Sequence, residues 1–316
     1  MARNDERDLL RQTVAALVDK HATPEAVRVA MESERGYDES LWQLLCEQVG
    51  AAALVVPEEL GGAGGELGDA AVVLEELGKA LVPTPLLGTI LAELALLAAP
   101  EPDAATLEQL AEGGAIGAVV FDDDNTVANG DIADIVVGAR DGQLQRWTEF
   151  STEPVATMDP TRRLGRITAT ATAPIGDDPG IADYAAILSA AEQIGAAARC
   201  LELTVEYTKS RVQFGRPIGS FQALKHRMAD LYVAVSAARA VVDDAIAEPS
   251  ATSAALARVV ASEAFSKVAG EAVQLHGGIA ITWESDIQLY FKRAHGSSQL
   301  FGQPAHHLRR LQAEVV

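Results

Sequence analysis

A repeating apolar pattern in the C-terminal half of the chain leaves few folds open to it. Apolar residues recur there at spacings of four and three residues in alternation, at Ile187, Ala191, Ile194, Ala198, Leu201 and Val205. This spacing puts one apolar stripe along a helix and is typical of the seam between packed helices. The pattern therefore predicts a long helix that is buried along one side.

Two more stripes of the same kind follow this helix. The second comprises Leu224, Met228, Leu231, Val235, Ala238 and Val242, and the third comprises Phe265, Val268, Ala272 and Leu275. A shorter helical segment lies near Ile287 to Leu300. Because successive amphipathic helices bury their stripes against one another, we expect residues 179–316 to form a C-terminal four-helix bundle.

The rest of the chain divides into a helical part and a small β part. Residues 1–114 alternate helical patches with short loops and predict an N-terminal helical domain. From Arg166 to Ala173 the pattern has a period of two, and short apolar runs occupy 118–121 and 135–137. Residues 115–178 should therefore form a truncated middle β domain, a partial sheet or barrel that another surface must cover. The predicted fold is mainly α with a small β insert (α+β).

Charge and composition exclude several classes of function. The formal net charge of −20 opposes binding to nucleic acid or to an anionic membrane. The longest apolar stretch, from Leu81 to Ala99, is broken by two prolines and a glutamate, so we expect no membrane span. Cys46 and Cys200 lie in apolar helical patterns and predict buried free thiols in a reducing cytoplasm. The His306-His307 pair lacks partners at metal-ligand spacing, so no metal site is assigned.

The segment between the first two bundle helices, residues 207–222, concentrates positive charge and an aromatic side chain. Lys209, Arg211 and Arg216 flank Phe214, and Gly215-Arg-Pro217 ends the helix. A planar guanidinium such as that of Arg211 matches the oxygens of a diphosphate, so this segment suits a nucleotide cofactor. A glycine-proline helix terminator with neighbouring cations explains the same residues structurally, and spacing alone leaves both interpretations open.

The third bundle helix ends in a second candidate segment, Gln274-Leu-His-Gly-Gly278. Paired glycines permit the close approach of a ligand or of another backbone, and the Gln274 amide can both donate and accept hydrogen bonds. A glycine that simply caps the helix is an equally good interpretation of the pattern.

Taken together, these segments resemble the C-terminal domain of the acyl-CoA dehydrogenase family. The motifs are Arg211-x-Gln-Phe-Gly-x-Pro-Ile-x-x-Phe-Gln222 and Gln274-x-x-Gly-Gly278. Val56-Pro-Glu-Glu-Leu-Gly-Gly62 and Val73-Leu-Glu-Glu-Leu-Gly78 look like the helical N-terminal domain of that family, and Asp159-Pro-Thr-Arg162 looks like part of its middle domain. The resemblance covers nearly the whole chain.

The resemblance implies FAD as cofactor and an acyl-CoA thioester as substrate. In this family the bundle of one subunit reaches over the adenosine diphosphate of the FAD held by its neighbour. The chemistry removes a proton next to the thioester and passes a hydride from the adjacent carbon to the flavin, which requires a poorly solvated carboxylate base. By position, the residues that resemble the reaching set are Arg211, Gln213, Phe214, Gln222, Gln274 and Gly278.

The sequence departs from the family where the catalytic base should lie. Phe301 occupies the usual position of the glutamate, and Ala185 lies near the alternative position. The middle domain lacks the Thr-Glu-Pro-x-x-Gly-Ser-Asp and Trp-(Ile/Phe)-(Thr/Ser) segments that hold the flavin ring and the thioester. Glu192 and Glu284 are the remaining candidates for a base, although a single helical glutamate such as Glu192 is more often a solvated or capping group. No catalytic residue is therefore assigned.

Other family positions are altered as well. Ala280 and Ile281 stand where glycine and an aromatic residue are usual, and Lys292-Arg293 stands where Arg-Asp is usual. These changes weaken the case for a complete site in this chain.

Three hypotheses follow. In the first, the chain resembles the shortened subunit of heteromeric actinobacterial acyl-CoA dehydrogenases that act on bulky, often steroid-derived, thioesters. A full-length paralogous partner would then supply the base within a heterotetramer, and an electron-transfer flavoprotein would accept the electrons. In the second, the chain is a self-sufficient homo-oligomeric dehydrogenase with Glu192 or Glu284 as base. In the third, it is a scaffold without catalysis.

Overall fold

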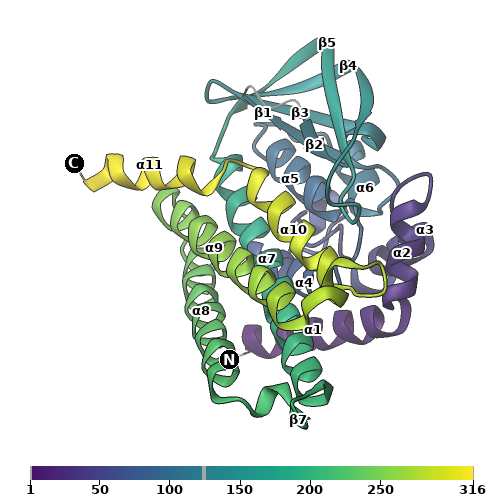
Figure 1. Ribbon diagram of the computed structural model, residues 1–316. Coiled ribbons are helices and arrows are strands. Elements are labelled where there is room, and N and C mark those ends of the chain that lie inside the picture. The colour runs from purple at the N-terminus through teal and green to yellow at the C-terminus, as the bar shows by residue number, and fades with distance from the viewer. Residues whose placement is uncertain (1, 123–125, 316) are drawn as a thin grey trace.

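The computed structural model describes residues 2–122 and 126–315. Figure 1 shows a β-sheet at the top, the N-terminal helices beneath it, and long C-terminal helices that run from the sheet to the bottom of the molecule. The mainly helical fold with a small β insert is confirmed. The domain boundaries at 114/115 and 178/179 stay predictions.

The N-terminal part is helical up to residue 111. Thr23 accepts a hydrogen bond from the Ala26 amide and starts α2 with Pro24 as its first residue, and Asp38 caps α3 in the same way. Such caps satisfy the free amides at a helix start. The helices are α1 (Ala2–His21), α2 (Pro24–Glu32), α3 (Glu39–Leu44), α4 (Leu67–Lys79), α5 (Leu86–Leu97) and α6 (Ala104–Ala111), with a π-helical turn at Leu45–Val49 and a 3₁₀ turn at Glu58–Leu60.

The middle part is a five-stranded sheet with the order β1-β3-β4-β5-β2. β1 and β3 pair in parallel, and the other neighbours are antiparallel. Asp141 and Gly142 both have positive φ and form the tight turn between β3 and β4, as Asp-Gly pairs do. The strands are β1 (Gly117–Phe121), β2 (Thr126–Ala128), β3 (Ile135–Arg140), β4 (Gln143–Val155) and β5 (Leu164–Asp177), with a 3₁₀ turn at Gly130–Ile132.

Helix α5 supplies the cover that the small sheet was expected to need. It packs on β1 and β3. The Thr89 hydroxyl accepts a hydrogen bond of 3.2 Å from the Gly117 amide, and a Cβ atom at Gly117 would lie 2.7 Å from that of Ala92. The absence of a side chain at Gly117 therefore sets how closely helix and sheet approach.

The C-terminal part contains the predicted bundle. Ile187, Ala191 and Ile194 of the first stripe are buried, as are Leu231 and Phe265 of the second and third. The helices are α7 (Ile181–Ser210), α8 (Gln222–Ala247), α9 (Ala251–His276) and α10 (Ile287–Gln299), with 3₁₀ turns at Ile218–Ser220 and Gly277–Ile281. The apolar stripes therefore mark the contacts between helices correctly.

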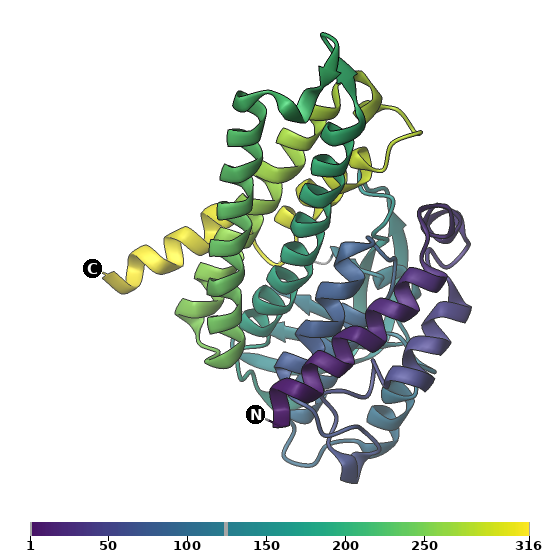
Figure 2. The same cartoon turned by 90° about the horizontal axis from the view of Figure 1, so that it is seen from below.

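A fifth C-terminal helix, α11 (Pro304–Val315), was not distinguished in the sequence. It leaves the bundle and projects from the body of the molecule, as Figure 2 shows. It packs against α9, and two polar contacts also hold its base: the His307 ring meets the Phe301 carbonyl at 2.9 Å, and Arg310 forms an ion pair of 2.6 Å with Asp183 of α7.

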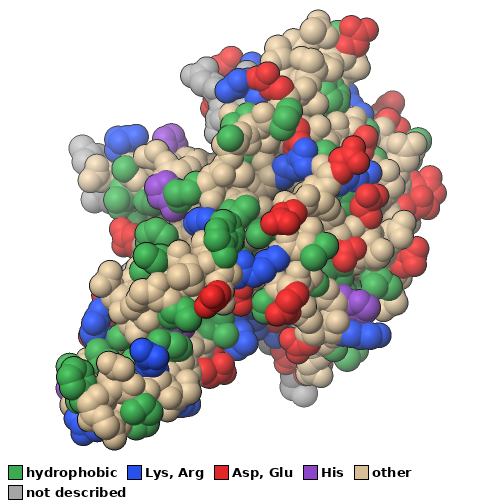
Figure 3. Space-filling model, turned by 45° about the vertical axis from the view of Figure 1, so that its right-hand side comes forward, with side chains coloured by type: hydrophobic (Ala, Val, Ile, Leu, Met, Phe, Trp, Pro, Cys, Tyr) green, Lys and Arg blue, Asp and Glu red, His purple; other side chains and the backbone are tan. Residues whose placement is uncertain are grey.

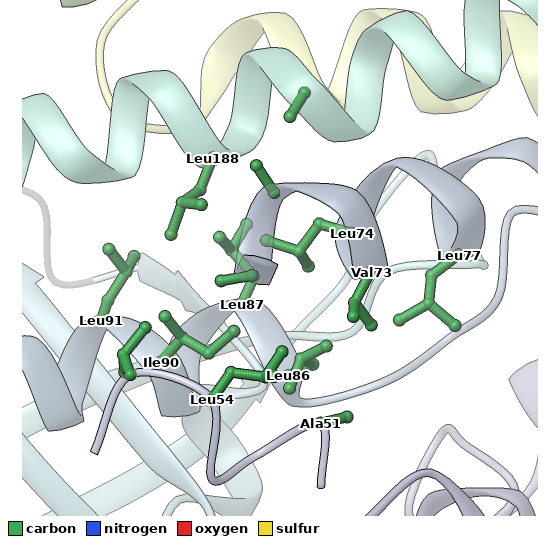
Figure 4. Close-up of a cluster of buried hydrophobic side chains, with 14 of the residues drawn as sticks. Ala51, Leu54, Val73, Leu74, Leu77, Leu86, Leu87, Ile90, Leu91 and Leu188 are labelled. Atoms are coloured by element: carbon green, nitrogen blue, oxygen red, sulfur yellow. The ribbon is translucent and has the colours of Figure 1, made fainter. Parts of the chain in front are cut away.

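Helices α4 and α7 cross at two glycines, and this crossing joins the N-terminal helices to the bundle. A Cβ atom at Gly195 would lie 2.0 Å from the Glu75 carbonyl oxygen, and one at Gly78 would lie 2.3 Å from the Glu192 carbonyl oxygen. Figure 4 shows Leu188 of α7 pointing into the adjoining core toward Leu87 of α5. The two parts thus share one continuous core.

Cys46 and Cys200 are buried free thiols, as predicted. Burial raises the pKa of Cys46 to about 12 and raises that of Cys200 as well, so neither thiol ionises readily. Within the part of the chain that the structure describes, no helix combines the length and the apolar character needed to cross a bilayer.

Candidate functional site

The segment after α7 folds into a tight hairpin at the tip of the bundle, which we call the elbow (residues 211–222). Strand β6 (Val212–Gln213) pairs with β7 (Arg216–Pro217) across the two residues Phe214 and Gly215. Their φ angles are 55° and 76°, as a two-residue turn with both central residues in the left-handed region requires. Gly215 adopts this conformation freely, whereas Phe214 does so at a cost in backbone strain.

Phe214 is therefore both strained and unburied. Its side chain is 92% exposed, and its only ring partner among the described residues is Phe221, which meets it edge-on at a centroid distance of 6.1 Å. A bulky residue with positive φ normally persists because its surroundings require it. Among the described residues, packing gives no such reason.

The cations in and beside the elbow lack acidic partners within the described part of the chain. Among the described residues no salt bridge involves Lys209, Arg211 or Arg216, although the chain carries a formal net charge of −20. Arg216 lies over the face of Phe221 at 4.0 Å, an arrangement that keeps the guanidinium at the surface. In Figure 3 this tip, at the bottom, carries mostly basic and hydrophobic side chains, while acidic side chains gather over the N-terminal helices at the right.

The Gln274–Gly278 segment lies at the same end of the bundle. Gln274, Gly277 and Gly278 are exposed, and a Cβ atom at either glycine would meet nothing within 4 Å. This open space could admit the backbone of a neighbour or a ligand. Tyr207 of α7 stacks on His276 of α9, so the two predicted segments lie side by side.

All six predicted contact residues are consequently surface residues at one tip. Within the described chain, the side chains of Arg211 and Gln274 form no hydrogen bond or salt bridge, and Phe214 is exposed. Gln213 donates to the Val212 carbonyl at 2.9 Å, and Gln222 pairs with the His226 ring at 2.8 Å. Gly278 lies in the turn that follows α9. The tip thus combines unpaired cations, an aromatic face and an open glycine turn, the groups that suit a nucleotide diphosphate.

The interpretation of Glu192 as a solvated or capping group is wrong. Glu192 is buried on α7 and forms ion pairs with Arg162 and with Arg293, the latter at 2.8 Å. Burial alone would raise its pKa, but the two guanidinium groups outweigh that effect and hold the pKa below its usual value. A carboxylate stabilised in this way is a poor acceptor for a proton from a carbon acid.

The space beside Glu192 is also too small for a substrate. Glu192, Arg162 and Arg293, together with Asp159 and Thr161, form what we call the Glu192 cluster. The cavity between part of this cluster and Leu77, Val82 and Leu87 has a volume of about 20 Å³. One water molecule needs roughly 10 to 15 Å³, so an acyl chain does not fit. Glu284, the other candidate base, lies exposed on the turn before α10.

Arg162 and Arg293 were not recognised as partners of Glu192 in the sequence. Arg293 also binds the Asp159 carboxylate at 2.8 Å and the Thr161 hydroxyl at 3.0 Å, so the Asp159–Arg162 motif closes on α10. The available signal was Lys292-Arg293 in place of Arg-Asp, since a charge reversal at one position requires a new partner. Nothing in the local sequence identified that partner as Glu192.

Phe301 occupies the position of the missing base and has a packing role. Its ring meets that of Phe121, at the end of β1, edge-on at 5.9 Å. Its carbonyl oxygen meets the His307 ring nitrogen at 2.9 Å. These contacts attach the link between α10 and α11 to the edge of the sheet, and Ala185 is buried in α7. Neither side chain can accept a proton.

Another hollow lies between the N-terminal helices and the bundle. It measures about 490 Å³, and its walls include Val18, Val27, Leu81 and Tyr290. Part of its charged rim is paired internally, for example Lys79 with Glu76 at 2.7 Å. None of the six predicted contact residues lines it.

Comparison with known proteins decides the family. Residues 4–117 match the family description "Acyl-CoA dehydrogenase, N-terminal domain" and residues 180–316 match "Acyl-CoA dehydrogenase, C-terminal domain". Acyl-CoA dehydrogenase IpdE2 of Mycobacterium tuberculosis is 72% identical over 311 residues, which cover 98% of each chain. The chain belongs to the acyl-CoA dehydrogenase family.

Solved acyl-CoA dehydrogenase structures share the whole architecture. The ChsE4-ChsE5 complex from Mycobacterium tuberculosis matches with a TM-score of 0.90 and 26% identity, covering 98% of this chain and 96% of that one. The Tcur3481-Tcur3483 steroid ACAD matches with a TM-score of 0.89 and 27% identity, covering 99% and 98%. This acyl-CoA dehydrogenase is therefore similar along its full length to chains found in two-component assemblies.

Proposed function

We propose that this chain is a subunit of an FAD-dependent acyl-CoA dehydrogenase and that it completes the flavin site of a full-length partner. The observation that carries the proposal is the elbow, where Arg211 and Arg216, which form no salt bridge among the described residues, flank a strained and exposed Phe214 in the sequence. Arg211, Gln213, Phe214, Gln222, Gln274 and Gly278 would contact the adenosine diphosphate portion of FAD. A diphosphate is the ligand that exposed guanidinium and amide donors suit best.

The partner would supply the proton acceptor. Phe301 and Ala185 stand at the two positions of the family base. The charge of the Glu192 carboxylate is balanced by two arginines, and the cavity beside it has a volume of about 20 Å³. These observations support a division of labour in which this chain clasps the cofactor and the partner removes the proton. When bound, FAD supplies the hydride acceptor.

The reaction would be the α,β-dehydrogenation of an acyl-CoA thioester. A bulky or steroid side-chain substrate is supported by the similarity to the Tcur3481-Tcur3483 steroid ACAD. A heterotetramer with a paralogous subunit is supported by the similarity to the ChsE4-ChsE5 complex. An electron-transfer flavoprotein would then reoxidise the flavin.

The proposal is tested by purifying the chain alone and together with its full-length partner. We expect the lone chain to carry little flavin and no dehydrogenase activity, and the complex to carry both. Native mass and the absorbance of bound flavin measure the outcome. Stoichiometric flavin on the lone chain, or acyl-CoA turnover by it, would contradict the proposal and favour the homo-oligomeric alternative.

Substitution of the elbow gives a second test. Arg211→Ala should weaken FAD binding by the complex roughly 10-fold to 100-fold, because a charge-assisted contact contributes about 1.5 to 3 kcal/mol. Arg166→Ala removes an exposed arginine of β5 and serves as the matched control, since Arg166 pairs only with Glu153 in the salt bridges of the described chain. An Arg211 variant that keeps normal affinity for FAD would refute the role of the elbow.

A further inference from the structure

The predicted contact residues come from two separate segments, and their relative position must be fixed by something beneath them. Arg211 to Gln222 follow α7, whereas Gln274 and Gly278 lie at the end of α9, more than fifty residues later. Each of the named side chains is exposed, so these residues do not hold one another in place. A site that clasps one ligand from two segments needs them held in register.

Tyr207 and His276 join these segments directly. Their rings stack with centroids 4.1 Å apart and an interplanar angle of 12°. The Tyr207 hydroxyl also donates a hydrogen bond of 3.2 Å to the His276 carbonyl oxygen. Tyr207 lies four residues before Arg211, and its own carbonyl accepts a hydrogen bond of 2.8 Å from the Arg211 amide. The contact therefore links the start of the elbow to the last turn of α9.

The hydrogen bond acts at the residue where the glycine turn begins. His276 is the last residue of α9, and Gly277 follows it with φ 67° and ψ −148°. Only glycine adopts this conformation readily, so the backbone changes direction at this point. The His276 carbonyl group and the Gly277 amide group lie in one peptide plane. By binding this carbonyl group, the Tyr207 hydroxyl fixes the orientation of the peptide plane that leads into the glycine turn.

The His276 ring has a packing role in this arrangement. Partial burial lowers the pKa of His276 to about 4, so the ring is neutral at physiological pH. Its Nε2 atom is buried and has no hydrogen-bond partner among the described residues. A neutral ring without a polar partner contributes its flat face, which Tyr207 covers.

We propose that Tyr207 and His276 are positioning residues for the FAD contact. Their stack and hydrogen bond hold the glycine turn at the distance from the elbow that lets both segments grip one diphosphate. The inference rests on the proposed function, and neither side chain needs to touch the cofactor. Tyr207 and His276 therefore form part of the flavin-binding apparatus although they lie outside the six contact residues.

The test is FAD affinity, measured by titrating FAD into the flavin-depleted complex. Tyr207→Phe removes the hydrogen bond and keeps the stack, and should raise the dissociation constant about threefold. Tyr207→Leu removes both and should raise it about tenfold or more. His276→Phe keeps a flat ring and the carbonyl group, and should retain nearly normal affinity. Tyr232→Leu, which removes an exposed tyrosine from α8, is the control and should change nothing.

A double substitution tells a positioning role of Tyr207 apart from a general loss of stability. Gln274→Ala alone should weaken FAD binding about tenfold, but in the Tyr207→Leu background it should add no more than about twofold, because the glycine turn is already out of place. Full additivity of the two substitutions would overturn the proposal. Tyr207→Phe changes the volume of the side chain by a single oxygen atom, so it still gives a result if the leucine variant does not fold.

The outcome for Arg211→Ala tells the two proposals apart. If Arg211→Ala weakens FAD binding while Tyr207→Leu does not, the flavin contact stands and the positioning role is wrong. If Arg211→Ala has no effect, the proposed function fails and the positioning role fails with it. Weak binding by His276→Phe would show that the imidazole acts chemically, which also contradicts a packing role.

Discussion

At the scale of single residues, Glu93 is the side chain least suited to its surroundings. It is fully buried on α5, and neither carboxylate oxygen has a hydrogen-bond partner among the described residues. Burial raises its pKa well above the ordinary value of 4.5, because the charged form is poorly solvated there. The folded protein therefore holds a proton on Glu93 that the unfolded chain releases more easily.

This burial predicts a dependence of stability on pH. Because the folded pKa lies above the unfolded one, the contribution of Glu93 is fully present below about pH 4.5 and is lost as the pH rises toward the folded pKa. Between pH 5 and pH 8 the wild type should therefore lose more free energy of unfolding than Glu93→Gln does. Urea unfolding at both pH values measures the difference, and Glu47→Gln at an exposed site should behave as the wild type does. Equal losses in the wild type and Glu93→Gln would contradict the prediction.

Phe214 provides a second prediction at the residue scale. Asparagine tolerates positive φ better than phenylalanine does, so Phe214→Asn should raise the free energy of unfolding of the chain by about 0.5 to 1 kcal/mol. The same substitution should weaken FAD binding by the complex, because it removes the exposed ring. Phe214→Ala keeps most of the strain and also removes the ring, so it should weaken binding without the gain in stability. Thermal unfolding and FAD titration of both variants provide the readouts.

At the scale of elements, the crossing of α4 and α7 depends on the absence of side chains. Gly195→Ala should lower the free energy of unfolding by about 2 kcal/mol or more, since the new methyl group would lie 2.0 Å from a backbone oxygen of α4. Gly270→Ala is the matched control: it lies on α9 with nothing within 4 Å of its Cβ position, and alanine there should stabilise the helix by about 0.5 to 1 kcal/mol. Denaturant unfolding compares the two, and a mild effect at Gly195 would show that the helices can move apart.

Elements were also the level at which the sequence was most informative. The alternating spacing of Ile187, Ala191 and Ile194 predicted the bundle because a helix brings such positions onto one face. The period of two around Ile167 predicted β5 for the corresponding reason in a strand. Helix α11 was not distinguished, although its apolar and polar residues are segregated, and few of its described side chains are buried. An apolar pattern shows which face of an element can be buried, but it does not show whether a neighbour covers that face.

Contacts between segments that are distant in the sequence could not be predicted. Glu192, Arg162 and Arg293 are separated by 30 and 101 residues, and their pairing depends on how the middle sheet sits on the bundle. The role of the elbow was equally open, because a helix terminator and a cofactor contact share the same residue types. The positions of the six contact residues were therefore predicted from family motifs, and their roles stay predictions.

At the scale of the whole molecule, the Glu192 cluster ties together all three parts of the chain. It joins α7 and α10 to the Asp159–Arg162 turn of the middle part, and its cavity borders Leu77 of α4. A third buried guanidinium, that of Arg258 on α9, donates to the Leu300 carbonyl at 2.6 Å, and burial lowers its pKa to about 10. Each of these buried charges is stabilised only by the oppositely charged or polar groups around it.

Removal of the central carboxylate should therefore destabilise the entire protein. Glu192→Gln leaves two buried arginines without their shared partner, and we expect a loss of about 3 kcal/mol in the free energy of unfolding. Glu202→Gln, on the same helix but at the surface beside Arg199, should cost less than about 0.5 kcal/mol. Thermal unfolding measures both. The complex with the partner should keep its turnover number where it folds; a complete loss of turnover in a well-folded Glu192→Gln complex would identify Glu192 as the base.

The exposure of most of the elbow has a consequence for how such a subunit can change over generations. None of its side chains is buried in the core, so replacing them one at a time should leave the fold intact. Natural selection at this tip consequently acts through whatever is bound against it and hardly at all through folding. A lineage could thus exchange one companion protein for another by a few surface substitutions, while the buried arginines and the glycines of the α4–α7 crossing stay as they are.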